Sequence, residues 1–238
     1  MEIQSKKNLI SYCVLVGVVI IVHYVIVLNP DISMQPGQRA IFSWPAIGFL
    51  GSLGLLSVIL LNLTKLKGLW DTDVSIEQKL IYPLIIGLLS GSIQVVYDLI
   101  TGLSALDAAN MGVESLNVVF PYSVPFYFGG AIITNILYYL ILIPIVVFLF
   151  STKLLKGKSE GIVFWSIGIL VALIEPLTNP GINYITQHGA IGIPVLLFVL
   201  FFNLLSVWFI RKYGFISAIF LRIGGYTVWH ILYGLFLI

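Results

Sequence analysis

The sequence predicts an all-α, polytopic transmembrane bundle of seven helices, with the N-terminus in the cytoplasm and the C-terminus outside. Three observations support this fold class. The 238 residues are 59% hydrophobic and only 9% charged, whereas a soluble domain has about a quarter of its residues charged. The hydrophobic residues form long blocks, and about 20 apolar residues cross the hydrocarbon core as a helix. These blocks lack the residue-by-residue alternation of a transmembrane barrel.

Short polar stretches, rich in proline and glycine, separate the apolar blocks. The first block follows Lys6 and Lys7, as in a signal peptide, but it has no small-residue cleavage site, so we expect a retained helix. We expect residues 1–238 to form one transmembrane domain. Its helices are predicted at about 8–28, 41–63, 79–100, 124–151, 161–179, 191–210 and 215–237. The Gly87-xxx-Gly91 spacing and the run of Gly48, Gly51 and Gly54 predict helix faces that pack closely against other helices.

Lysine and arginine are distributed unequally between the two sides of this arrangement. The cytoplasmic segments carry Lys6, Lys7, Lys65, Lys67, Lys79, Lys153, Lys156, Lys158, Arg211 and Lys212, whereas the outer segments carry Arg39 alone. Because positively charged loops stay in the cytoplasm, the charges predict this orientation for a multi-pass protein of the cell membrane. The net charge of +2 is too small to indicate a nucleic-acid partner. The expected partners are the lipid bilayer and, within it, another membrane protein or a lipophilic ligand.

Several polar side chains fall within the predicted spans, where an ionisable group costs about 2.5–3.5 kcal/mol. At a rise of about 1.5 Å per residue, four of them lie roughly 20–25 Å from the cytoplasmic ends of their helices: His23, Gln94, Glu175 and His230. Arg222 lies roughly 12 Å from the cytoplasmic end of its helix. Asp98 is expected at a solvated helix end, and the two asparagines are expected to join neighbouring helices. The full set is His23, Gln94, Asp98, Asn135, Glu175, Asn203, Arg222 and His230.

Arg222, Tyr226 and His230 recur every four residues and therefore form one stripe on a helix. Glu175 precedes Pro176, where the backbone tends to leave the helical conformation. We predict a ligand site made of Glu175, Arg222, Tyr226 and His230, in which Glu175 and His230 are the candidate acid and base. The alternative is a structural ion pair between Glu175 and Arg222.

Two imidazoles and one carboxylate also suit zinc, so His23, Glu175 and His230 are candidate metal ligands. Their spacing does not require a metal, and we expect no cofactor. The sequence contains no H-E-x-x-H motif and no glycine-rich phosphate loop.

The C-terminal third carries residues in a recognisable order. A basic pair and Tyr-Gly at Arg211-Lys-Tyr-Gly are followed by a small apolar run to Arg222 and then by Tyr226-Thr-Val-Trp-His230. Over roughly residues 161–238 this pattern resembles the CPBP (CAAX protease and bacteriocin-processing) membrane family. The resemblance implies peptide hydrolysis by two glutamates and two histidines that hold a water or a metal.

The catalytic positions of that family are largely changed in this chain. Glu175-Pro176 stands where the family has paired glutamates, Arg222 stands at its late histidine, and Tyr226 stands at the following asparagine. Losing one member of each pair removes the geometry of the general base. The resemblance therefore implies a degenerate member without protease activity.

Three functions remain open from the sequence. The first is a CPBP-like protein that binds a partner or a lipophilic ligand within the bundle without cleaving peptides. The second is a small-solute or ion transporter, with Glu175, Arg222 and His230 along the path. The third is an enzyme that acts on a lipid, isoprenoid or peptide substrate within the membrane.

The predicted orientation can be tested with alkaline phosphatase fusions. A fusion after residue 115 should be active, because the loop of about residues 101–123 is predicted to lie outside, and a fusion after residue 156 should be inactive. The reverse pattern would overturn the orientation, and activity at both positions would overturn the helix count.

Overall fold

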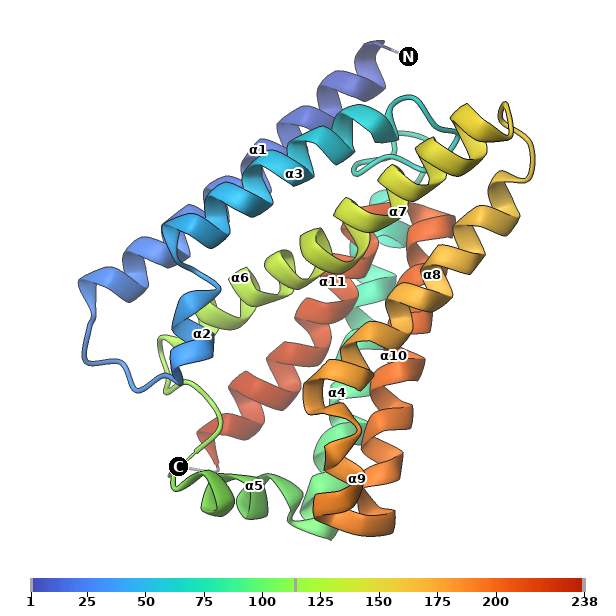
Figure 1. Ribbon diagram of the computed structural model, residues 1–238. Coiled ribbons are helices and arrows are strands. Elements are labelled where there is room, and N and C mark those ends of the chain that lie inside the picture. Colours follow the sequence, from blue (N-terminus) through green and yellow to red (C-terminus); the bar gives the residue numbers. More distant parts are fainter. Residues whose placement is uncertain (1, 114, 237–238) are drawn as a thin grey trace.

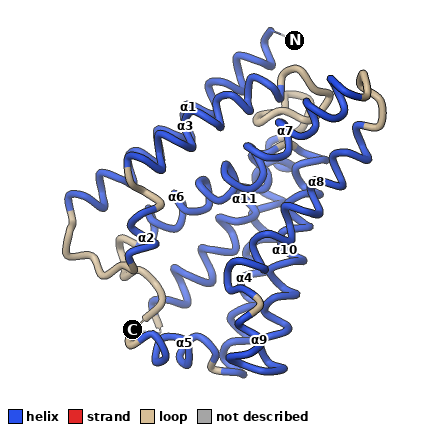
Figure 2. Tube along the Cα trace, in the orientation of Figure 1, coloured by secondary structure: helices blue, strands red, loops and turns tan. Residues whose placement is uncertain are grey.

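The computed structural model describes residues 2–113 and 115–236, apart from the side chains of residues 36, 179 and 180, and these residues form helices and loops without strands (Figures 1 and 2). Its α-helices are α1 (Glu2–Leu28), α2 (Pro36–Ala40), α3 (Trp44–Leu61), α4 (Tyr82–Thr101), α5 (Leu103–Met111), α6 (Ser123–Asn135), α7 (Leu142–Val146), α8 (Glu160–Pro176), α9 (Asn183–His188), α10 (Ile193–Tyr213) and α11 (Phe215–Tyr226). The predicted all-α fold class is confirmed.

Short π- and 3-10-helical segments join several of these helices into longer rods. The π segments are η1 (Glu77–Ile81), η2 (Ile136–Ile141), η3 (Val147–Leu154), η4 (Leu177–Gly181) and η6 (Thr227–Leu232), and the 3-10 segments are η5 (Gly189–Gly192) and η7 (Tyr233–Leu235). In this way η1 extends α4, and η2, α7 and η3 extend α6. A π turn widens the backbone locally, and such turns are frequent at functional sites.

Within the described residues, six helical stretches are long and apolar enough to cross a membrane: Glu2–Leu28, Trp44–Leu61, Glu77–Thr101, Ser123–Leu154, Asn183–Tyr213 and Phe215–Leu235. These six agree with predicted spans, although the first begins earlier than expected and Asn183–Tyr213 begins well before the predicted residue 191. The remaining predicted span contains α8, which has 17 residues and continues as η4. The chain is therefore a multi-pass helical bundle with six such spans.

Helices α4 and α11 pack against each other with their backbones in contact at glycine positions. A Cβ atom on Gly87 would meet the carbonyl oxygen of Leu221, and one on Gly224 would meet the carbonyl oxygen of Leu84. One turn further along, a Cβ on Gly91 would lie 2.7 Å from the carbonyl oxygen of Gly225. Small residues allow such backbone contact between membrane helices, as the spacing of Gly87 and Gly91 predicted.

The glycines of α3 behave differently from the close-packing face that their spacing predicted. Gly48 and Gly51 have open space where a Cβ would lie, so the prediction was wrong for them. Only Gly54 is in a close contact, with the ring of Tyr12 on α1. Helices α1 and α3 run side by side on one flank of the bundle (Figure 1).

The two ends of the bundle are built differently. The start of α1 lies at the same end as the loops after α3 and before α8, whereas α2, α5, α9 and the last described residues lie at the opposite end (Figure 1). At this second end, Asp98 accepts a hydrogen bond from the Ser104 amide at 2.8 Å and from the Tyr233 hydroxyl at 2.8 Å. The Asp98 side chain is therefore buried and fixes the start of α5, which corrects its expected role as a solvated helix end.

The glycine crossing predicts unequal effects of one added methyl group. Gly87→Ala should lower the free energy of unfolding by about 1–3 kcal/mol, because two helix backbones must separate to admit the methyl group. Gly51→Ala, at an open position, should be neutral or slightly stabilising. Thermal unfolding of both variants in the same detergent tests this, and equal effects would contradict the close approach of α4 and α11.

Candidate functional site

A buried ion pair joins α8 to α11 in the interior. The two terminal nitrogens of Arg222 donate to the two carboxylate oxygens of Glu175, at 2.8 and 2.7 Å. The Arg222 side chain is 3% exposed and that of Glu175 14%. Two parallel charge-assisted bonds of this kind are the strongest geometry available to the pair. The ion pair between these residues, one of the alternatives from the sequence, is present.

Local structure brings Glu175 to the arginine. Pro176 ends the regular hydrogen bonding of α8, and the chain continues as the π segment η4. The hydroxyl of Thr178 donates to the Ile174 carbonyl at 2.8 Å and so satisfies a backbone group near the break. The sequence estimate put Glu175 and Arg222 at heights about 9 Å apart, and the extended arginine closes that gap.

Two further side chains hold the guanidinium in place. Arg222 donates to Asn203 Oδ1 at 3.0 Å and to the Tyr226 hydroxyl oxygen at 3.3 Å. Asn203 Oδ1 also accepts from the Tyr139 hydroxyl at 3.1 Å, and its amide nitrogen donates to the Ala172 carbonyl at 3.2 Å. Asn203 therefore links α10 to α8, α11 and η2, as expected of a residue that joins helices.

Asn135 does not have the same role. Its amide nitrogen donates to the Ala131 carbonyl of its own helix at 2.8 Å, and its buried Oδ1 has no partner among the described residues. The prediction that Asn135 joins neighbouring helices was therefore wrong. Among the described residues, one other buried side-chain nitrogen or oxygen has no hydrogen-bond partner, the Nε of Arg222.

The ion pair lies in the wall of a cavity of about 280 Å³. Glu175, Arg222, Tyr226 and His230, the four predicted ligand residues, all line this cavity. The remaining wall is mainly apolar and aromatic, with Phe198, Phe202 and Trp229 among its residues. The structure thus brings the four candidates together, while their contact with a ligand stays a prediction.

His230 is oriented by Asn117 of the loop before α6 and by Tyr127 of α6. Its Nδ1 lies 2.7 Å from Asn117 Oδ1, and its ring stacks on Tyr127 with centroids 4.1 Å apart. The Tyr127 hydroxyl accepts from the Val118 amide and donates to the same Asn117 oxygen, at 3.1 Å each. Asn117 Oδ1 therefore acts as an acceptor, which puts the proton of neutral His230 on Nδ1 and leaves Nε2 as a hydrogen-bond acceptor.

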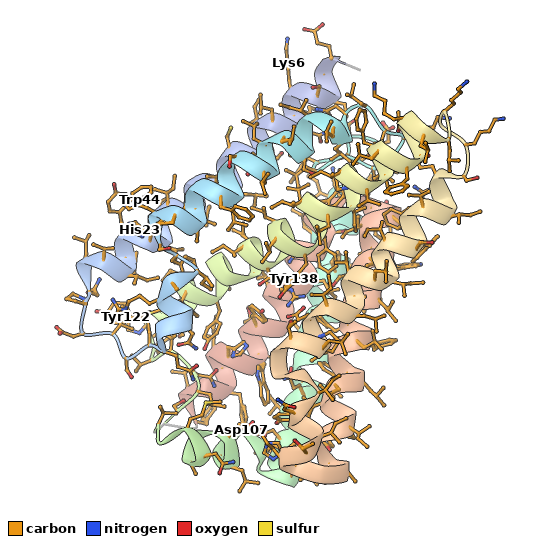
Figure 3. All side chains as sticks on the ribbon, in the orientation of Figure 1. Lys6, His23, Trp44, Asp107, Tyr122 and Tyr138 are labelled. Carbon is orange, nitrogen blue, oxygen red and sulfur yellow. The ribbon has the colours of Figure 1, made fainter. Side chains whose placement is uncertain are left out.

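The candidate metal site is not formed. His23 lies beside Trp44 on the α1–α3 flank, away from Asp107 of the cavity wall (Figure 3), and its Nδ1 is 2.7 Å from the Phe42 carbonyl oxygen. Within the described ranges, no three histidine, cysteine or acidic side chains lie close enough to share a metal ion. Glu175 and His230 reach the cavity but His23 does not, because α1 packs against α3 and α6 rather than against α8 or η6.

Sequence reasoning missed a cluster that closes one end of the cavity. Asp107 on α5 accepts from the Tyr184 hydroxyl at 3.0 Å and lies 2.7 Å from His188 Nε2. Tyr184 and His188 come from α9, and both Asp107 and Tyr184 line the cavity. The available signal was the four-residue spacing of Tyr184 and His188, which places both on one helical face. These residues fall between predicted spans, so the search for polar groups at membrane depth did not consider them.

The site therefore combines carboxylates whose oxygens all have partners with neutral groups that have none among the described residues. Both oxygens of Glu175 are bound by Arg222, and both oxygens of Asp107 have partners. By contrast, the Gln94 amide and the His230 Nε2 line the cavity without a hydrogen bond to any described residue. The surface that a ligand meets is mostly apolar, with a few neutral hydrogen-bonding groups.

Comparison of the chain with protein-family models, with curated proteins and with solved structures finds no match. The CPBP resemblance over residues 161–238 therefore stays a hypothesis.

The buried pair predicts non-additive effects of mutation. Glu175→Gln and Arg222→Gln should each lower the stability by about 3–5 kcal/mol, because each leaves a buried charge without its partner. The double variant should regain much of that loss, since it has no unpaired charge. Thermal unfolding of the four proteins measures the coupling.

The exposed pair Glu2–Lys6 provides the control, because its side chains are 81% and 70% exposed. Glu2→Gln should change the stability by less than about 1 kcal/mol. A double variant of the buried pair as damaged as the sum of its single changes would show that Glu175 and Arg222 are not coupled.

Proposed function

We propose that this chain is a membrane protein that binds a small lipophilic ligand in the cavity between α4, α8, α10 and η6, and that it does not cleave peptides. The proposal rests on one observation, the bidentate ion pair between Arg222 and Glu175. A general base must be able to take a proton from its donor. The bidentate bond holds both oxygens of the carboxylate against the guanidinium, and protonation of Glu175 would break this buried ion pair, so the cavity is better suited to binding than to hydrolysis.

The proposal includes seven membrane crossings, with the N-terminus in the cytoplasm. The start of α1 and the end of the described chain lie at opposite ends of the bundle (Figure 1). A chain that begins on one side and ends on the other crosses an odd number of times, which supports a crossing by α8 and η4 in addition to the six longer spans. The lysine-bearing loops at the end where α1 starts support the orientation.

Kinship with the CPBP family forms part of the same proposal. The arginine that neutralises Glu175 stands at the position of the family's late histidine, and Tyr226, which accepts a bond from it, stands at the following asparagine. The resemblance and the geometry therefore support the same function, a degenerate member whose former catalytic carboxylate has become structural.

Transport of a small solute is the second candidate, because one helix is interrupted beside the cavity. The rod that begins with α8 changes to π-helix at Leu177 and turns into α9, and Glu175 lies at that break. Broken helices form the substrate sites of many transporters. Glu175 and Arg222 occupy each other, however, so neither offers a free charge to a passing ion.

Extraction of bound molecules tests the binding function. Protein purified from membranes should retain an apolar, solvent-extractable molecule that mass spectrometry detects in near-stoichiometric amount. Val199→Phe should reduce that amount at least about tenfold, because Val199 lines the cavity and the larger ring removes volume from it. Leu197→Phe is the matched control on the same helix, because Leu197 is 59% exposed and lies outside the cavity wall.

Equal retention by the two variants, or no retained molecule in the unchanged protein, would contradict binding in this cavity. Prenylated and membrane peptides should remain intact when incubated with the purified protein. Cleavage that Glu175→Gln abolishes would show that the carboxylate is catalytic despite its partner, and the enzyme hypothesis would replace this one.

A further inference from the structure

A second, apolar cavity lies against the first. It measures about 120 Å³ and is lined by Ile93, Gln94 and Tyr97 of α4 together with Pro194, Val195 and Phe198 of α10. Gln94, Val195 and Phe198 also line the main cavity. The two spaces thus share a wall of three residues and lie along the same seam between α4 and α10.

This seam is a groove on the apolar outer surface of the bundle. Ile93 is 62% exposed and Leu197 59%, and both belong to stretches apolar enough to span a membrane. At one end of the groove the Tyr97 hydroxyl donates to the Ile191 carbonyl at 2.6 Å. Among the described residues no other hydrogen bond joins α4 to the rod of η5 and α10, so no further hydrogen bond closes the seam.

The polar groups at the inner end of the groove specify an uncharged partner. His230 Nε2 is an acceptor, the Gln94 amide both donates and accepts, and the Tyr226 hydroxyl, which accepts from Arg222, retains its proton for donation. A hydroxyl group can donate to the imidazole and accept from the amide at the same time. A ligand that covered these groups without offering a hydroxyl would remove them from water and leave them unpaired.

Charged head groups fit this cavity poorly. Its wall contains the carboxylates of Glu175 and Asp107, and the only arginine in it already forms two bonds with Glu175. A phosphate or a carboxylate would therefore find no free cation in the wall, because the charge of Arg222 is already balanced by Glu175. A quaternary ammonium group would find both carboxylates occupied, and it cannot donate to His230.

Size also restricts the ligand. A cavity of about 280 Å³ is at the lower limit of about 300–1,000 Å³ for drug-sized ligands. It can hold a head group, whereas an alkyl chain attached to that head has the apolar groove as its path outward. The groove opens toward the region where lipid chains lie, so a ligand can enter from the bilayer without passing through water.

We infer that the ligand is a single-chain amphiphile with an uncharged, hydroxyl-bearing head, which enters laterally between α4 and α10. The head binds Gln94 and His230 in the main cavity, and the chain lies in the groove beside Val195 and Phe198. This inference rests on the proposed binding function and specifies its ligand class and its route of entry.

Quenching of tryptophan fluorescence by brominated chains tests the ligand class. The chain has five tryptophans, and Trp229 lines the cavity, so a reporter protein keeps Trp229 and carries phenylalanine at the other four. It is placed in phosphatidylcholine nanodiscs and titrated with dibromostearoyl glycerol, with the same lipid bearing a phosphate, and with dibromostearoyl choline. The glycerol ester should quench Trp229 at a mole fraction about tenfold lower than the two charged probes, the effect of one or two hydrogen bonds.

A second reporter that keeps only Trp44 controls for probe concentration in the bilayer. Trp44 is 50% exposed on α3 and lies outside the cavity, so the three probes should quench it equally. A preference for the glycerol ester at Trp44 as well would reflect partitioning into the bilayer and would overturn the inference.

Two substitutions in the Trp229 reporter distinguish the site of the head group in the main cavity from the portal, which is the groove between α4 and α10. Gln94→Leu keeps the approximate shape but removes the amide, so it should abolish most of the preference for the glycerol ester. Val195→Phe narrows the groove and should reduce quenching by that ester severalfold, whereas Leu197→Phe, on the lipid-facing side of α10, should not. Size-exclusion chromatography and thermal unfolding establish that each variant is folded.

The outcomes distinguish this inference from the function on which it rests. If Val199→Phe lowers quenching of Trp229 but the three probes quench equally, the cavity binds a ligand and the inferred head group is wrong. If Val195→Phe and Leu197→Phe behave alike, the portal between α4 and α10 is wrong. If Val199→Phe changes quenching by no probe and no bound molecule is extracted, both proposals are wrong.

Discussion

The buried guanidinium of Arg222 is the constraint on which the rest of this structure depends. A charge within a membrane helix is unfavourable by about 2.5–3.5 kcal/mol or more unless it is paired, and Arg222 lies on α11 at the centre of the bundle. Glu175, Asn203 and Tyr226 supply its hydrogen bonds from α8, α10 and α11 itself. These bonds fix the rotation of three helices, and the cavity is the space left beside them.

The same constraint determines what kind of chemistry the site can perform. Because Arg222 binds both oxygens of Glu175, this carboxylate joins α8 to α11. The contact of Gly87 and Gly91 with α11 then brings α4 against the site, and with it the amide of Gln94. Neutral groups on a mostly apolar wall remain available, and such a surface suits a lipophilic molecule with a small polar head.

Hydropathy and composition were sufficient to predict the helical class, the approximate spans and the polar residues inside them. The stripe of Arg222, Tyr226 and His230 could be predicted because helical periodicity places residues four apart on one face. The pairing of Glu175 with Arg222 could also be anticipated, since an unpaired charge in hydrocarbon is so unfavourable. By contrast, the prediction for the glycines of α3 was wrong at Gly48 and Gly51. Small residues permit close packing, but they do not show that a neighbouring helix lies against them.

The sequence by itself thus determined which stretches are apolar enough to span a membrane and which charges need partners, because transfer free energies and helix geometry are local properties. Only the tertiary structure decided that His23 faces a different flank from His230. It also decided that Asn117 orients His230, and that Asp107, Tyr184 and His188 join α5 to α9. These contacts depend on the rotation of each helix and on the path of each loop. Helix rotation and loop path are determined by packing between segments far apart in the chain. The periodicity of a single segment therefore cannot predict them.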